Sequence, residues 1–178
     1  MRKLRNEELD RISSDDINEV PKHPIVIVLD NIRSRHNVGS AFRTADAFLC
    51  NKVILCGITA KPPHREIHKT ALGATDTVKW EYFEHTSAAV TSLKNQGYLI
   101  ASIEQADESI SLEQFDVKPN EKLALIFGNE VKGVDAKIVD NADYVIEIPQ
   151  FGTKHSLNVS VSIGIIIWDL ICKLKITG

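Results

Sequence analysis

Short, continuous runs of apolar residues alternate along the chain with longer segments in which apolar and polar positions mix. Residues 25–29 form an unbroken aliphatic run of strand length, which is typical of a strand buried on both faces of a parallel sheet. Residues 38–48 are expected to form a helix with Asn37 as its N-cap, and residues 53–56 a second strand. A strand, a helix and a strand within about 30 residues predict a β-α-β unit.

The same alternation continues through the rest of the chain. A loop at residues 62–74 is expected to contain a short helix, and the polar residues 104–120 are expected to be irregular. Further strands are predicted at residues 77–83, 98–103, 123–127 and 144–148, and further helices at residues 86–96 and 134–141. This order of elements predicts an α/β fold with a mostly parallel sheet flanked by helices.

The apolar segment at residues 156–175 has an ambiguous period. Apolar and polar residues alternate over residues 157–165, which by itself favours a strand. The segment is long and has no internal turn signal, so we predict a helix. A helix that is apolar on nearly all sides must be covered by the sheet and, as a further candidate, by a second subunit. Asp169 interrupts the apolar run, which is too short for a membrane span.

The composition fits one compact domain. A chain of 178 residues with 43% hydrophobic content is able to bury about 70% of its unfolded surface. Residues 1–22 are charged, carry helically spaced aliphatic residues before Pro21 and Pro24, and are expected to form an N-terminal arm or helix. A solvated helix face is the favoured interpretation of its charges, with contact to a polyanion as the alternative. Residues 23–178 are expected to form the main domain.

Charge and cysteine content narrow the class of protein. Three cysteines without a CxxC pair and a charged N-terminus without an apolar signal segment predict a reduced, cytoplasmic protein. A net charge of -3 argues against a strongly basic nucleic-acid binder but leaves room for a local basic patch. His64 and His68 stand four residues apart on the expected short helix, yet no third ligand accompanies them, so no metal site is expected.

Three loops that follow predicted strands collect the unusual polar and glycine residues. They lie at residues 30–43, 128–134 and 149–158. Because ligands of open parallel sheets bind beyond the carboxyl ends of the strands, we expect the three loops to meet on one side of the sheet. This side of the domain is therefore the candidate site.

Familiar phosphate and hydrolase motifs do not account for these loops. Residues 128–133 have the glycine spacing of a P-loop, but Val134 and Asp135 stand where lysine and a hydroxyl residue are required. No GxGxxG follows a strand, which excludes the dinucleotide-binding fingerprint. His155 and Ser156 are adjacent and lack a GxSxG elbow, so we do not expect them to act as a hydrolase pair.

Three longer stretches contain these loops: NIRSRHNVGSAFRTA at residues 31–45, IFGNEVKGV at residues 126–134, and IPQFGTKHSLNV at residues 148–159. In this order and spacing they resemble the three motifs of the SpoU, or TrmH-type, RNA 2'-O-methyltransferases of the SPOUT superfamily. The likeness covers roughly residues 24–175. The three motifs are specific together, whereas any one of them alone is not.

The resemblance implies an α/β domain whose C-terminal part is threaded into a deep trefoil knot, and a homodimer packed through its N-terminal and C-terminal helices. It also implies S-adenosyl-L-methionine as the cofactor, bound in the knotted loops largely by backbone groups. The motif positions expected to contact it are Phe127, Gly128, Ile148, Pro149 and Leu157. Gly128 permits close approach to a ligand, and aliphatic side chains suit a purine face, although core packing explains those side chains equally well.

The resemblance places catalytic roles on Arg43, Asn37, Glu130, Ser156 and Asn158. Methyl transfer to a ribose 2'-hydroxyl needs that hydroxyl deprotonated, or nearly so, in line with the sulfonium methyl group. A guanidinium stays protonated in proteins, so we expect Arg43 to stabilise the developing alkoxide and to orient phosphate or ribose. Asn37 either holds Arg43 or only caps its helix. The alternative to a catalytic role is a solvated surface carboxylate for Glu130 and a simple helix cap for Asn158.

RNA contacts are expected from basic residues of the same motifs. Arg33, Arg35 and His36 precede the catalytic arginine on one loop and, with Lys132 and Lys154, suit phosphate contacts. The resemblance thus predicts an S-adenosyl-L-methionine-dependent enzyme that methylates a ribose 2'-hydroxyl in tRNA or rRNA, without a metal or a membrane. The alternative is a noncatalytic RNA-binding protein on the same fold, against which the complete catalytic set speaks.

Overall fold

The computed structural model describes residues 1–9, 11–13, 16–17 and 19–177. Within this part of the chain, one sheet of seven strands has the order β3-β2-β1-β6-β4-β7-β5, and every neighbouring pair is parallel. The strands are β1 (His23–Asp30), β2 (Cys50–Cys56), β3 (Trp80–Phe83), β4 (Leu99–Ile103), β5 (Ile110–Ser111), β6 (Leu123–Phe127) and β7 (Tyr144–Glu147). The predicted parallel α/β fold is confirmed.

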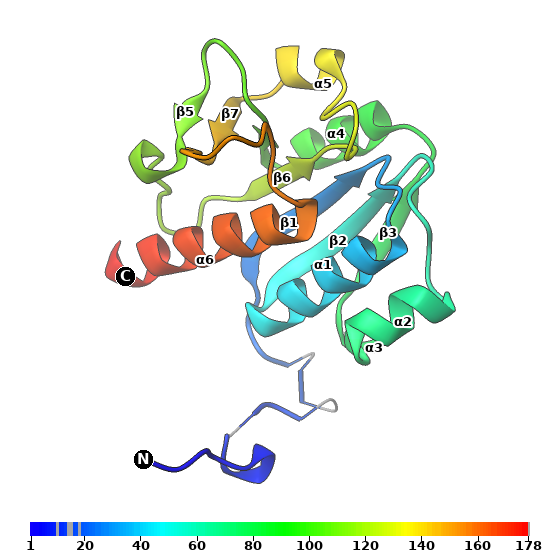
Figure 1. Ribbon diagram of the computed structural model, residues 1–178, viewed down its shortest axis with the longest axis vertical. Helices are drawn as coiled ribbons and strands as arrows, with labels where there is room; N and C mark the ends of the chain where they lie inside the picture. The colour runs from blue at the N-terminus through cyan, green and yellow to red at the C-terminus, as the bar shows by residue number, and fades with distance from the viewer. Residues whose placement is uncertain (10, 14–15, 18, 178) are drawn as a thin grey trace.

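Helices cover both faces of this sheet (Figure 1). The α-helices are α1 (Arg35–Ala47), α2 (Arg65–Ala71), α3 (Ala74–Thr77), α4 (Thr86–Asn95), α5 (Ala136–Asp140) and α6 (Val159–Thr177), and short 3-10 helices are η1 (Asn6–Glu8) and η2 (Leu112–Gln114). α1 and α6 share a core with one face of the sheet, whereas α4 and α5 share a core with the other. The domain therefore has three layers.

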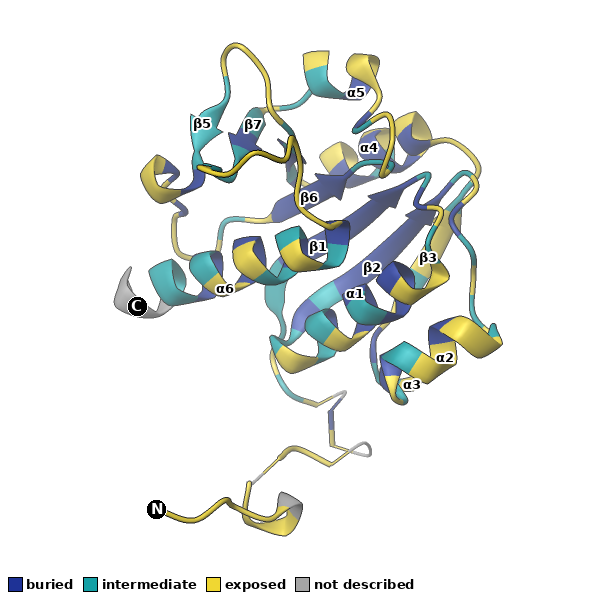
Figure 2. Ribbon diagram, in the orientation of Figure 1, coloured by how far each residue is buried: buried dark blue, intermediate teal, exposed yellow. Residues whose placement is uncertain are grey.

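The uninterrupted apolar run at residues 25–29 of β1 follows from burial on both faces of the sheet. Ile25, Ile27 and Leu29 contribute to the core beneath α1 and α6, while Val26 and Val28 contribute to the core beneath α4 and α5. Each of these five side chains is at most 1% exposed. Figure 2 shows the central strands buried between exposed helix faces. Because successive side chains point to opposite faces of a sheet, only a strand covered on both sides favours an apolar residue at every position.

Helices α1 and α2 pack unusually closely at Gly39. A Cβ atom added to Gly39 would lie 2.0 Å from the Thr70 Oγ1 atom and 2.4 Å from the Ile67 carbonyl oxygen. The Thr70 hydroxyl also donates a hydrogen bond to the His36 carbonyl oxygen at 3.2 Å. Any larger residue at position 39 would separate the two helices, so this glycine fixes α2 against α1.

Two predicted boundaries are wrong at the start of helices. α1 begins at Arg35 and is capped by Ser34, whose Oγ accepts a hydrogen bond from the Asn37 backbone N–H at 3.3 Å. Asn37 is therefore inside the helix rather than its N-cap, and Arg35 and His36 lie on the helix rather than on a loop. The closing helix, predicted from residue 156, begins only at Val159.

The polar connection between β4 and β6 is more ordered than predicted. It contains the two-residue strand β5, which pairs in parallel with β7, and the 3-10 helix η2. Lys173 of α6 donates to the carbonyl oxygens of Leu112 and Phe115 at 2.6 and 2.8 Å. The long last helix thus stabilises a segment whose own sequence carries little periodicity.

The N-terminal segment lies away from the sheet (Figure 1). Of the predicted arm or helix at residues 1–22, the described residues contain only the 3-10 turn η1, and residues 10, 14, 15 and 18 lie outside the described part. Most of the described side chains before β1 are exposed, with Ile17 a buried exception. Among the helices of the described chain, none combines the length and apolar character that crossing a membrane requires.

Candidate functional site

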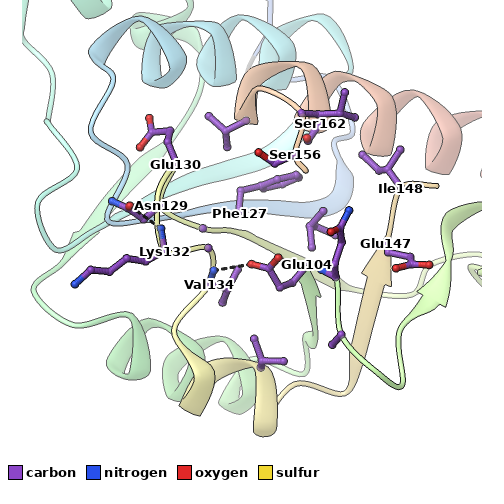
Figure 3. A pocket seen from close by; sticks show the side chains of 18 of the residues that line it. Glu104, Phe127, Asn129, Glu130, Lys132, Val134, Glu147, Ile148, Ser156 and Ser162 are labelled. Atoms are coloured by element: carbon purple, nitrogen blue, oxygen red, sulfur yellow. Dashed lines mark hydrogen bonds between the residues drawn. The ribbon is translucent and has the colours of Figure 1, made fainter. Parts of the chain in front are cut away.

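A cavity of about 770 Å³ lies at the carboxyl ends of β4, β6 and β7. Its walls come from residues 103–106, residues 127–134, helix α5 through Ala136, Val139 and Asp140, and the stretch from residue 146 into the beginning of α6. Figure 3 shows their side chains converging on one space. The second and third loops singled out by sequence are therefore brought together, and a segment not singled out completes the wall.

Many of the predicted site residues line this cavity. They are Phe127, Gly128, Ile148 and Leu157 of the expected cofactor contacts, Glu130, Ser156 and Asn158 of the expected catalytic set, and Lys132 of the expected RNA contacts. Phe127 is buried, Ile148 is half-buried, and Leu157 is 38% exposed. The lining therefore combines apolar surfaces with hydroxyl, amide and charged groups, as ligand sites generally do.

The other predicted site residues do not line this cavity. They are Pro149, Asn37, Arg43, Arg33, Arg35, His36 and Lys154. Arg43 lies on an exposed part of α1 and lines a separate hollow between α1 and α2. Asn37 is only 8% exposed and directs its side-chain amide to Glu130. No hydrogen bond joins Asn37 to Arg43 in the described structure, so Asn37 neither caps the helix nor holds the arginine.

Glu130 connects the second sequence motif to the first. Its carboxylate accepts hydrogen bonds from the backbone N–H groups of Arg33 and Ser34, both at 3.0 Å, and from Asn37 Nδ2 at 3.2 Å. Partial burial raises the pKa of Glu130, but the hydrogen bonds from these donors outweigh burial and hold the pKa below its ordinary value. The carboxylate is therefore ionised while it joins the loop after β6 to the start of α1.

Asn129 shapes the same loop and was not among the predicted site residues. Its Oδ1 accepts from the backbone N–H groups of Val131 and Lys132 at 2.9 and 3.2 Å, and its Nδ2 donates to the Asn31 carbonyl oxygen at 2.7 Å. Its backbone exchanges two hydrogen bonds with Gly133. Asparagine side chains commonly form hydrogen bonds with backbone groups two residues later in the chain, and this tendency is the sequence signal that points to Asn129.

Gly128 leaves no room for a side chain. A Cβ atom at this position would lie 2.1 Å from the carbonyl carbon of Gly133 and 2.1 Å from the backbone nitrogen of Val134. The loop is thus folded back on its own beginning, and the backbone of Gly128 lies open to the cavity. Glycine is thus required here by the packing of the loop on itself, and the close approach to a ligand for which it was expected stays a prediction.

Glu104, at the end of β4, is a second residue that sequence reasoning missed. Its Oε2 accepts from the backbone N–H of Val134 at 2.9 Å, and its Oε1 from the N–H of Gln105 at 3.0 Å. Figure 3 shows the Glu104 carboxylate inside the ring of lining residues. With Glu130, Glu147 and Asp140 also in the lining, carboxylates outnumber its one lysine. The cavity therefore suits a ligand that carries positive charge.

Asn158 has the helix-capping role that was considered for it and also lines the cavity. Its Oδ1 accepts from the Ser160 backbone N–H at 2.9 Å, and its carbonyl oxygen accepts from the N–H groups of Val161 and Ser162. The cap explains why α6 begins at Val159, directly after Asn158. It also fixes the Ser156–Asn158 segment at the mouth of the cavity, because the helix is anchored in the core by its apolar face.

A parallel sheet covered by helices on both faces, with a cavity at the carboxyl ends of its strands, defines an α/β protein whose ligand site is built by loops. Residues 24–168 match the family described as the SpoU rRNA Methylase family. The chain belongs to this family.

Individual relatives agree with this assignment. The chain is 34% identical over 149 residues to an uncharacterized tRNA/rRNA methyltransferase of Borreliella burgdorferi, covering 84% of this chain and 64% of that protein. It is 32% identical over 159 residues to a tRNA (guanosine(18)-2'-O)-methyltransferase of Aquifex aeolicus, covering 86% of this chain and 72% of that protein. The chain thus spans less than two thirds of the first relative's length.

Solved structures share the fold. The A. aeolicus TrmH/SpoU tRNA modifying enzyme superposes with a TM-score of 0.81 at 27% identity, covering 93% of this chain and 84% of that one. An AdoMet-bound rRNA methyltransferase from Sinorhizobium meliloti superposes with a TM-score of 0.80 at 24% identity, covering 89% and 60% of the two chains. The predicted resemblance is therefore confirmed at the level of family and architecture.

Proposed function

We propose that this protein is an S-adenosyl-L-methionine-dependent methyltransferase that methylates a ribose 2'-hydroxyl in tRNA or rRNA in the cytoplasm. The observation that carries the proposal is the cavity built by the second and third motifs and joined to the first motif through Glu130. The printed names of the relatives, which include tRNA and rRNA methyltransferases, support it.

The cavity lining fits the proposed cofactor. Gly128 lets the backbone approach a ligand, while Phe127, Ile148 and Leu157 offer apolar surface to its adenine ring. The carboxylate of Glu104 suits the positive charge of a sulfonium. When bound, the cofactor supplies an electrophilic methyl group. The residues of the chain hold it, exclude water and orient the hydroxyl that accepts the methyl.

Arg43 completes the proposed site only if it comes from a second subunit. Its side chain does not line the cavity of its own chain, so we include a homodimer in the proposal, in which each subunit presents Arg43 to the cavity of its partner. An exposed apolar stripe on α6 supports this assembly: Val161, Ile165 and Trp168 are 48%, 37% and 57% exposed. They stand on one side of the helix, at the spacing of a helix–helix contact.

The cation at position 43 would stabilise the alkoxide that forms as the 2'-hydroxyl attacks the methyl group. We further propose that residues 23–178 form one domain whose C-terminal part is threaded as a trefoil knot. The meeting of the loops after β6 and β7 in one cavity supports this arrangement. Residues 1–22 are proposed as a separate arm.

The test is transfer of a labelled methyl group from S-adenosyl-L-methionine to tRNA and rRNA, with nuclease digestion to find the ribose-methylated nucleotide. Arg43→Ala should abolish transfer while cofactor binding and folding persist, because the side chain is exposed and outside the cofactor cavity. Arg65→Ala, another exposed arginine that lines neither the cavity nor the Arg43 hollow, is the matched control and should retain transfer.

Two results would contradict the proposal. Full transfer by Arg43→Ala would remove this arginine from the mechanism. Binding of both cofactor and RNA by the wild-type protein, without transfer to any RNA fraction, would favour the noncatalytic RNA-binding protein.

A further inference from the structure

The hollow between α1 and α2 is lined by two cations and three hydroxyl side chains. The hollow has a volume of about 420 Å³. Its lining includes Ser40, Arg43 and Thr44 of α1 and Lys69 and Thr70 of α2. No carboxylate contributes to its lining, which Ala47, Phe48 and Leu72 complete. This composition differs from that of the large cavity, where carboxylates predominate.

We propose that this hollow binds a phosphate group of the RNA backbone, and that Lys69 is the cation that holds it beside Arg43. The inference rests on the proposed function, because it names a contact of the proposed RNA substrate with the proposed catalytic arginine. It adds a residue outside the three sequence motifs, since Lys69 lies on the short helix α2.

The first argument is the charge balance of the hollow. Among the described residues, neither Arg43 nor Lys69 forms an ion pair. On the same two helices, by contrast, Arg35 Nη1 lies 3.6 Å from Glu66 Oε2, so part of its charge is already balanced. The two cations in the hollow thus remain available to an anion that enters it.

The second argument is rigidity. Helices α1 and α2 lie side by side (Figure 1), and their close approach at Gly39 and the Thr70 hydrogen bond to His36 hold them together. Arg43 and Lys69 therefore stand on two fixed elements. A site carried by packed helices needs little ordering when its ligand arrives. The cost of binding is therefore lower than for cations on a mobile loop.

The third argument is the match to phosphate chemistry. A guanidinium binds phosphate oxygens through two parallel N–H groups, and an ammonium adds a compact charge with three donors. The Ser40 and Thr44 hydroxyls face the same hollow, and no hydrogen bond engages either hydroxyl in the described structure. Backbone phosphates carry one negative charge each and are contacted by these residue types without regard to sequence.

The experiment compares Lys69→Gln with Lys69→Arg and with Lys118→Gln in the full chain. Lys118 is an exposed lysine between η2 and β6, and it lies outside the lining of the hollow. Affinity for an unmodified tRNA transcript is measured over a series of salt concentrations. Affinity for S-adenosyl-L-methionine is measured by calorimetry, and the oligomeric state by sedimentation.

We expect Lys69→Gln to weaken RNA binding about three- to tenfold near physiological salt and to reduce the slope of log K against log[salt] by about 0.7–0.9, the value for one lost phosphate contact. Lys69→Arg should keep both quantities near wild type, because it keeps the charge. Lys118→Gln should change neither. Cofactor affinity should be unchanged in all three variants.

An unchanged RNA affinity and salt slope in Lys69→Gln would overturn the phosphate site, as would a wild-type protein that does not bind the transcript. A shift of oligomeric state in Lys69→Gln would also overturn it, because the hollow would then be a contact between two copies of the chain. The calorimetric measurement is independent of these outcomes. Cofactor binding without the Lys69 effect would therefore leave the proposed cofactor site standing and reject only this inference.

Discussion

The carboxylate of Glu130 is the most direct link between distant parts of the proposed site, and its removal should have a measurable cost. Glu130→Ala deprives the backbone N–H groups of Arg33 and Ser34 and the side chain of Asn37 of one shared acceptor. A hydrogen bond to a charged group contributes about 1.5–3 kcal/mol when it is shielded from water. Because Glu130 is exposed, hydrogen bonds to water will offset much of the energy lost with these contacts. We therefore expect a total loss of about 1–2 kcal/mol.

Urea unfolding provides the measurement, and a double-mutant cycle with Asn37→Ala separates the side-chain contact from the two backbone contacts. The coupling between the two positions should be about 0.5–1 kcal/mol, as for one hydrogen bond that joins a loop to a helix. Glu108→Ala is the matched control, because Glu108 is an exposed glutamate whose side chain makes no hydrogen bond or ion pair within the described chain. It should change stability by less than about 0.5 kcal/mol.

The reasoning would be refuted by either of two results. If Glu130→Ala costs no more than Glu108→Ala, the carboxylate does not hold the loops together in solution. If the cycle gives a coupling energy indistinguishable from zero, the Asn37 contact has no energetic role. Loss of cofactor binding alone, with unchanged stability, would instead assign Glu130 to ligand contact.

The ionisation of Glu130, the packing at Gly128, the exposed stripe of α6 and the charge of Glu104 can each be tested in the same way. The pKa of Glu130 is lower in the folded than in the unfolded protein, so its ionised carboxylate stabilises the fold above the unfolded-state pKa of about 4.3, and this stabilisation is lost as the pH falls through the folded-state pKa. In urea titrations, the difference in stability between wild type and Glu130→Gln should therefore vanish below about pH 4. A difference that persists at lower pH contradicts this. Gly128→Ala forces a methyl group to within 2.1 Å of the Gly133 backbone, so it should lower stability by about 1–3 kcal/mol and abolish cofactor binding in equilibrium dialysis; normal binding would show that the loop adapts. Trp168→Glu places a charge on the exposed stripe of α6 that the proposed homodimer buries, so the mass from sedimentation should fall from that of a dimer to that of a monomer with little loss of thermal stability, and an unchanged mass would reject this face as the interface. Glu104→Gln removes one negative charge from the cavity, so calorimetry should show S-adenosyl-L-methionine affinity falling about three- to tenfold while that of S-adenosylhomocysteine, which lacks the sulfonium charge, changes less; equal losses would assign Glu104 to loop shape alone.

The central strands were predictable from sequence because burial on both faces leaves a strong signal, whereas the two-residue strand β5 lies in a stretch predicted to be irregular. β1 and β6 read as unbroken apolar runs, and both lie at the centre of the sheet. The start of α1 was not predictable in the same way. Ser34 and Asn37 are both favourable N-cap residues. In the structure Ser34 caps the helix, and the Asn37 side chain instead donates a hydrogen bond to Glu130, which lies on a loop far along the chain.

The cavity was predictable in part, since the second and third motifs supply most of its wall. The position of Arg43 was not, because sequence spacing does not say which side of a helix faces a cavity. Residues six positions apart on an α-helix are separated by about 120° around its axis. Asn37 is accordingly buried and turned toward Glu130, while Arg43 is exposed. Glu104 follows an ordinary strand and precedes a polar stretch, and only the pairing of β4 between β6 and β7 brings it to the cavity.

The order of strands affects how the protein folds during its synthesis on the ribosome. β1 pairs with β2 on one edge, and this unit is complete early in translation, but its other edge pairs with β6, where Ile25 meets Leu123. Until β6 emerges, that edge exposes unpaired backbone groups beside the apolar residues 25–29, which is a template for association with other nascent chains. We expect slow synthesis between the codons for β2 and β6 to lower the yield of soluble protein.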